Sequence, residues 1–195
     1  MRWQDGGVRR EQANLPNKDV PAMTSSRLGL LALSLSVALG TAIAPVLAQQ
    51  AQNLGTFKSW TAWKGTDANG EMCYISATPQ SSQPTGVNRS PIHFLIIHRK
   101  GLGTKNEVQT LIGYPFNTAN SSASAAVDGK TFPMVTEGEA AWLASAADEP
   151  NFVSALKAGS TLVVKGTSQR GTNTTDTYDL GGVTAAMTEI DKACT

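Results

Sequence analysis

The strongest hydrophobic pattern in the chain is the apolar run at residues 91–99, Pro-Ile-His-Phe-Leu-Ile-Ile-His-Arg. A short continuous apolar run bounded by turn residues is typical of a central strand that is buried on both faces. Aromatic, β-branched and alternating segments predict further strands, with glycine, proline or asparagine between them at intervals of about eight to twelve residues. The predicted strands are residues 57–63, 71–77, 91–99, 107–113, 139–143, 160–168 and 174–180, with a hairpin over 123–134 that turns at Asp128-Gly129.

Two segments have a helical pattern instead. Residues 148–159 begin with two acidic residues and a proline, carry apolar residues on one side and end at a glycine, as a short helix does. Residues 183–193 place apolar side chains at helical spacing, which predicts a terminal helix. Many short strands and two short helices predict a mainly β, single-domain β-sandwich or flattened barrel with a short internal helix and a C-terminal helix.

The N-terminal part has the pattern of a secretory signal peptide. Arg27 precedes an uncharged stretch, residues 28–43, and small residues follow up to Ala48. The stretch is shorter than the roughly 20 residues of a membrane-spanning helix, so a membrane anchor is disfavoured. We expect cleavage between Ala48 and Gln49, and no stable membrane insertion afterwards.

These signals divide the chain into four parts. Residues 1–22 have no apolar period, and Met23 begins a well-proportioned signal peptide. We therefore expect 1–22 to be a non-native or untranslated extension, and 23–48 to be the signal peptide. Residues 49–55 are a short polar lead, and 56–195 form the β-rich domain.

Composition and charge fit one globular domain without a nucleic-acid partner. The chain has 195 residues, of which 41% are apolar and 16% charged, well outside the range of disordered proteins. Its formal net charge is +1, and loss of residues 1–48 would leave 11 basic and 12 acidic side chains. A nearly neutral domain has no field that attracts nucleic acid or an anionic membrane.

Cys73 and Cys194 are the two cysteines of the chain. In an exported protein, two cysteines far apart in sequence indicate a structural disulfide. A redox site would need the Cys-x-x-Cys spacing, and a zinc site would need clustered cysteine and histidine. The sequence therefore predicts a Cys73–Cys194 disulfide.

The residues that usually carry catalysis are few and badly spaced. His93 and His98 are five residues apart on a predicted strand, so they point to opposite faces and are unsuited to a shared metal. Asp176 and Asp179 also point apart on a regular strand, which disfavours a paired-carboxylate site. The sequence has no nucleophile elbow, no Walker-type phosphate loop and no complete dinucleotide fingerprint. We therefore expect no catalytic, cofactor-binding or metal-binding residues, and no enzymatic activity.

Two groups of residues are candidates for partner binding. Trp60, Trp63 and Trp142 would bind a sugar or a protein if exposed, although aromatic residues of a β-sandwich more often fill the core. Lys165 and Arg170 lie in the small polar hairpin 165–175, whose tip either faces a ligand or is simply solvated.

Several segments together resemble one known family. They are Cys73-Tyr-Ile-Ser76, 91–99, Asn106-Glu-Val108, Gly113-Tyr-Pro-Phe116, 165–180, 182–186 and 191–194. In order and spacing they resemble the invasion-associated locus B family of alphaproteobacterial envelope proteins, over most of residues 57–195. The resemblance implies an exported, disulfide-closed, β-rich domain. The family name implies a contribution to host-cell invasion, although similar proteins occur in free-living bacteria, and it brings no catalytic residues.

Three functional hypotheses follow. The leading one is a non-enzymatic periplasmic, surface-associated or secreted binding protein, whose partner is an envelope or host protein. The alternative is an envelope hydrolase for a cell-wall or carbohydrate substrate, which requires His93 or His98 to meet Asp176, Asp179 or Glu107 in one cleft. The third is a purely structural role in the envelope.

Overall fold

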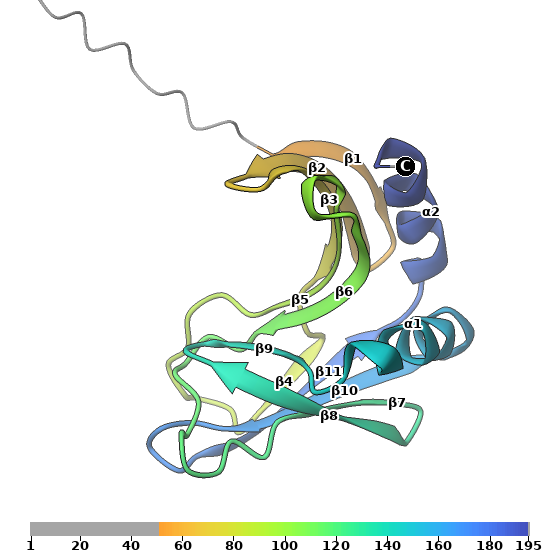
Figure 1. Ribbon diagram of the computed structural model, residues 1–195. Coiled ribbons are helices and arrows are strands. Elements are labelled where there is room, and N and C mark those ends of the chain that lie inside the picture. The colour runs from red at the N-terminus through yellow and green to blue at the C-terminus, as the bar shows by residue number, and fades with distance from the viewer. Residues whose placement is uncertain (1–50, 195) are drawn as a thin grey trace, which may run out of the picture. The chain divides into compact units, whose positions relative to one another are not determined.

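The computed structural model of the protein describes residues 51–194 (Figure 1). The extension and the signal peptide predicted at 1–22 and 23–48 lie outside these residues. In chain order the elements are β1 (Gln52–Phe57), β2 (Trp60–Asp67), β3 (Gly70–Ala77), β4 (Ser81–Gln83), β5 (His93–Arg99), η1 (Lys100–Leu102), β6 (Thr104–Leu111), β7 (Ser124–Val127), β8 (Lys130–Glu137), β9 (Ala140–Leu143), η2 (Ala146–Asp148), α1 (Glu149–Ala158), β10 (Thr161–Thr167), β11 (Asn173–Asp179) and α2 (Val183–Ala193).

The strands form one open antiparallel sheet in the order β1-β2-β3-β5-β6-β9-β8-β7-β10-β11-β4. This sheet bends until its two halves face each other across the core (Figure 1). The centroid of the Phe94 ring of β5 lies 5.8 Å from that of the Tyr178 ring of β11 and 5.9 Å from that of the Phe152 ring of α1. The Trp60 indole of β2 donates its Nε1–H to the carbonyl of Asp179, at 2.9 Å. The predicted mainly β fold with an internal and a C-terminal helix is confirmed.

The inward and outward faces follow from the alternation of side chains along each strand. On β10, Leu162 and Val164 are buried, whereas the next residue, Lys165, points outward and is exposed. On β11, Asp176 and Tyr178 are buried on the same inner face. Each fully buried large apolar side chain contributes about 1.5–3 kcal/mol, so this pattern fixes the register of the sheet.

Helix α2 covers β1, β2 and β3, and the predicted disulfide holds its C-terminal end. Cys73 of β3 is bonded to Cys194, with their Cα atoms 5.9 Å apart. The helix begins after Gly182, whose φ of +96° and closeness to the Phe57 carbonyl require glycine, since a Cβ there would lie 1.9 Å from that oxygen. Within residues 51–194, no helix is both long enough and apolar enough to cross a membrane.

The sheet contains two strands that the hydrophobic pattern did not predict. Strand β1 starts at Gln52, inside the predicted polar lead 49–55, and a turn at Lys58 separates it from β2, so the single predicted strand 57–63 is wrong. Strand β4 lies within the predicted loop 78–90 and pairs with β11. Both strands form edges of the sheet and are ordered by pairing on one side. β4 is short and polar, and only Leu54 and Phe57 of β1 pack against the core, so neither strand has a regular apolar alternation.

Candidate functional site

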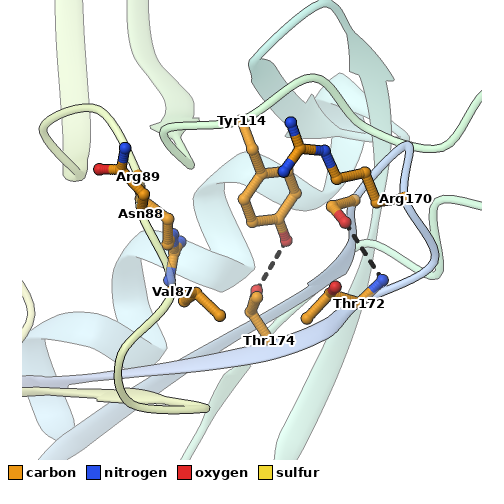
Figure 2. A pocket seen from close by; sticks show the side chains of 8 residues that line it. Val87, Asn88, Arg89, Tyr114, Arg170, Thr172 and Thr174 are labelled. Atoms are coloured by element: carbon orange, nitrogen blue, oxygen red, sulfur yellow. Dashed lines mark hydrogen bonds between the residues drawn. The ribbon is translucent and has the colours of Figure 1, made fainter.

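A pocket of about 200 Å³ opens beside the tip of the β10–β11 hairpin (Figure 2). Three segments supply its walls: the loop after β4, the loop after β6, and the hairpin tip with the start of β11. Its lining residues are Val87, Asn88, Arg89, Tyr114, Ser168, Arg170, Thr172 and Thr174. Drug-sized ligands usually occupy pockets of about 300–1,000 Å³, so this one suits a single small chemical group.

A buried ion pair forms one side of the pocket. The guanidinium of Arg89 donates from Nη1 and Nη2 to the two carboxylate oxygens of Asp176, at 2.8 and 2.6 Å. Its Nε and Nη2 also donate to the carbonyl of Ile112, at 3.0 and 2.6 Å. The side chain of Arg89 is 6% exposed and that of Asp176 is fully buried. The charge of Arg89 is therefore balanced inside the protein, and the loop after β4 is tied to the sheet.

Tyr114 lies between this ion pair and the hairpin. The guanidinium carbon of Arg89 is 5.0 Å from the centroid of its ring, a cation–π distance. Its hydroxyl is hydrogen-bonded to the hydroxyl of Thr174 at 2.6 Å. Burial raises the pKa of Tyr114, so its phenol stays neutral and contributes no negative charge to the pocket.

The hairpin tip is held by its own hydrogen bonds. The N–H of Thr172 donates to the Ser168 hydroxyl at 3.1 Å, and the N–H of Ser168 donates to the Thr172 carbonyl at 2.9 Å. Arg170 projects from this tip, and Figure 2 shows its side chain extending toward the Tyr114 ring. Arg170 is exposed, and it forms no ion pair with any residue of the described part of the chain.

The electrostatics of the pocket follow from these contacts. Among residues 51–194, no acidic side chain lines it. Since Asp176 neutralises Arg89, the positive charge of Arg170 remains unbalanced. The pocket thus presents one net positive charge beside neutral hydroxyl and amide groups.

The three tryptophans predicted as partner contacts do not form one cluster. The prediction for Trp60 is wrong, because its ring is fully buried against Phe94 and is inaccessible in the folded domain. Trp63 is half-buried on the outer face, where it stacks on Tyr74 with ring centroids 6.3 Å apart and donates its Nε1–H to the Ser76 hydroxyl. Trp142 is also half-buried, on β9.

The two basic residues predicted at the hairpin are separated as well. Arg170 lines the pocket, whereas Lys165 is exposed on β10 and is not among the lining residues. Arg89 and Tyr114 were not singled out as site residues from the sequence. The only signal for Tyr114 was its place in the segment Gly113-Tyr-Pro-Phe116, which carried the family resemblance, and Arg89 lay in an unremarkable predicted loop.

The two histidines lie on opposite faces of the sheet, as predicted. His98 is buried beneath α2, where its Nδ1 accepts the N–H of Asn106 at 3.2 Å. Its Nε2 therefore carries the proton and donates to Asp191 of α2 at 2.9 Å. His93 instead lines a separate outer hollow of about 230 Å³ beside Trp63.

The carboxylates that a hydrolase would use are engaged elsewhere. Glu107 accepts two hydrogen bonds from Arg99, at 2.8 and 3.1 Å. Asp179 accepts from the Gly181 N–H and the Ser59 hydroxyl, which together lower the pKa of Asp179, and Asp176 is paired with Arg89. The meeting of histidine and carboxylate that the hydrolase hypothesis requires is thus not found in the described part of the chain. There, no group of three histidine, cysteine, aspartate or glutamate side chains is placed to hold a metal ion either.

Comparison with known proteins gives one family match. The model of the family described as "Invasion associated locus B (IalB) protein" matches residues 62–191, which contain the whole pocket and both histidines. Comparisons with curated proteins and with solved structures gave no significant match. Because the match spans well over half of the chain, the protein belongs to the invasion associated locus B family.

Proposed function

We propose that this domain is a non-enzymatic binding module of the cell envelope and that it holds a protein partner at the hairpin-tip pocket. One observation carries the proposal: Arg170 stands without an ion-pair partner of the described chain at the mouth of a pocket lined by hydroxyl and amide groups. By contrast, His98, Glu107 and Asp176 are each engaged in an internal contact. A surface of unused donors is suited to recognition, and engaged side chains are suited to stability.

The location belongs to the same proposal. A disulfide between residues 121 positions apart is typical of a protein that folds in an oxidising compartment. The signal-peptide pattern and the family membership support export. The domain would then act in the periplasm, on the outer surface or after secretion, and a host protein as partner would account for a contribution to host interaction.

The test is crosslinking in living cells with a C-terminally tagged copy of the full chain, followed by mass spectrometry. Three forms are compared: the wild type, R170A, and K105A as a matched control, because Lys105 is exposed and does not line the pocket. We expect one dominant envelope or host protein with the wild type and K105A, and a strong reduction with R170A.

Two results would contradict the proposal. A partner recovered equally well with R170A would place the contact elsewhere on the domain. No dominant partner with any form, together with high cellular abundance, would favour the purely structural role.

A further inference from the structure

The charge of the hairpin-tip pocket restricts what it can hold. Its unbalanced charge is the single guanidinium of Arg170, since Asp176 accepts two hydrogen bonds from Arg89. A guanidinium presents a planar fork of N–H groups that matches a carboxylate or a phosphate. A phosphate monoester carries about −1.5 to −2 charges near neutral pH, which exceeds the one positive charge present. A carboxylate matches it.

The neutral groups around Arg170 are suited to the same ligand. The Ser168 oxygen accepts the Thr172 N–H, so the Ser168 hydroxyl keeps its own proton to donate. Thr172 lines the same cavity and brings a second hydroxyl. A carboxylate accepts about four hydrogen bonds, so it can engage the guanidinium and one or two of these donors together. Because internal hydrogen bonds already hold the tip, little order has to be gained on binding.

The surroundings indicate that the carboxylate is attached to a chain. A second groove of about 550 Å³ lies along the same loop and shares Val87, Asn88 and Arg89 with the pocket. Its further lining residues include Pro79, Pro84, Pro91 and Ile92 as well as serine and threonine hydroxyls. Val87, between the two hollows, is 41% exposed although it is a large apolar residue. A free anion would leave this apolar ridge unused, whereas an extended peptide would cover it.

We infer that the hairpin-tip pocket binds the carboxylate of an aspartate or glutamate side chain from an extended segment of a protein partner, with Arg170 as its ion-pair partner and the adjoining groove as the seat of the flanking residues. This inference rests on the proposed function and adds the chemistry of the ligand. It makes Arg170 the residue that selects an acidic over a neutral side chain.

The test uses the purified full chain, labelled with ¹⁵N and with its disulfide formed. Two libraries of short peptides are prepared, identical in their random positions, one with glutamate and one with glutamine fixed at the centre. The backbone amide signals of Ser168, Arg170 and Thr172 are followed by NMR during titration. Acetate and inorganic phosphate, each alone, serve as probes for a free anion, and K105Q is the matched control for R170Q.

We expect the glutamate library to shift these three signals at lower concentration than the glutamine library, acetate or phosphate. Loss of a charge-assisted hydrogen bond costs about 1.5–3 kcal/mol, so R170Q should weaken the response by about tenfold or more. R170K keeps the positive charge but lacks the planar fork of N–H groups, so it should restore part of the response to the glutamate library. K105Q should respond as the wild type does.

Each other outcome overturns the inference in a distinct way. An equal response to the two libraries would show that the pocket does not select a carboxylate ligand. Equal binding of acetate would make the pocket a free-anion site, and tighter binding of phosphate would change the ligand class. The crosslinking experiment separates this inference from the proposed function. If the two libraries respond equally but the crosslinked partner is still lost with R170A, the proposed function stands. If the partner is recovered equally well with R170A, the proposed function itself is overturned.

Discussion

Replacing Arg89 by methionine removes the guanidinium that neutralises the fully buried carboxylate of Asp176. Methionine keeps most of the volume of the arginine stem but none of its donors, so Asp176 loses two hydrogen bonds and the Ile112 carbonyl loses two more. Breaking a buried ion pair by removing one partner typically costs about 3–5 kcal/mol. We expect R89M to lower the free energy of unfolding by that amount, and D176V to do the same by leaving Arg89 uncompensated.

The double variant R89M/D176V separates the charge from the packing. Apolar residues of similar volume often replace a buried ion pair at little cost, because neither charge then has to be desolvated. The double variant should therefore be more stable than either single variant, whereas independent effects would add to about 6–10 kcal/mol, twice the cost of one broken buried pair. K64M serves as control, since the Lys64–Glu71 pair is about one-third exposed on both sides and a pair exposed to solvent contributes little to stability.

The measurement is urea-induced unfolding with the disulfide intact, followed by circular dichroism and by tryptophan fluorescence. Coinciding transitions with the two probes justify a two-state free energy. If R89M cost no more than K64M, Arg89 and Asp176 would have to be hydrated like a surface pair. If the double variant lost the sum of the single losses, the two residues would act independently, and the ion pair would not be what ties the loop to the sheet.

Three further predictions concern the rest of the domain. Replacing Cys73 and Cys194 together by serine should lower the free energy of unfolding by about 5 kcal/mol on the chain-entropy model, because the disulfide closes a loop across 121 positions. Urea unfolding of this variant and of the oxidised wild type measures the difference. Trp60→Ala should cost about 3–5 kcal/mol in the same assay, and Trp63→Ala roughly half of that or less, since Trp60 is fully buried and Trp63 is half-exposed; equal losses would contradict these placements. The pKa of Asp179 lies below its ordinary value of 3.8, so its stabilising contribution is present above that pH and is lost as the pH falls through the lower folded value. D179N should therefore melt at a lower temperature than the wild type near neutral pH, and the two melting curves should converge in strong acid; a constant difference at every pH would refute the assignment.

The elements that the sequence predicted correctly are those with a strong local cause. The apolar run of β5 forms a strand inside the sheet with Phe94, Ile96 and Ile97 buried, although His93 and Leu95 on its outer face are only partly buried. Asp128 and Gly129 form the β7–β8 turn with positive φ, and the apolar face of α2 packs on the core. In each case neighbouring residues alone favour the structure that forms. Strands β1 and β4 lack such a cause, because their partly exposed residues are ordered by pairing with β2 and β11.

The pocket was predictable only in part, for a similar reason. The sequence predicted Arg170 as a candidate partner contact because it is a charged residue in a hairpin tip, which is a local feature. Arg89 and Asp176 are 87 positions apart, and no periodicity connects a loop arginine to an inward-facing aspartate on a distant strand. Only the fold of the sheet, which brings β4 beside β11, makes them a pair.

The two arginines of the pocket therefore have different roles, although both line the same cavity. Asp176 balances Arg89 inside the domain, so Arg89 serves the position of the loop after β4, and the net charge that a partner meets comes from Arg170. Arg170 is exposed, so R170Q should change the free energy of unfolding by no more than about 0.5 kcal/mol. A site built in this way can change its ligand preference by substitution at one exposed position of a hairpin tip, without loss of the fold that supports it.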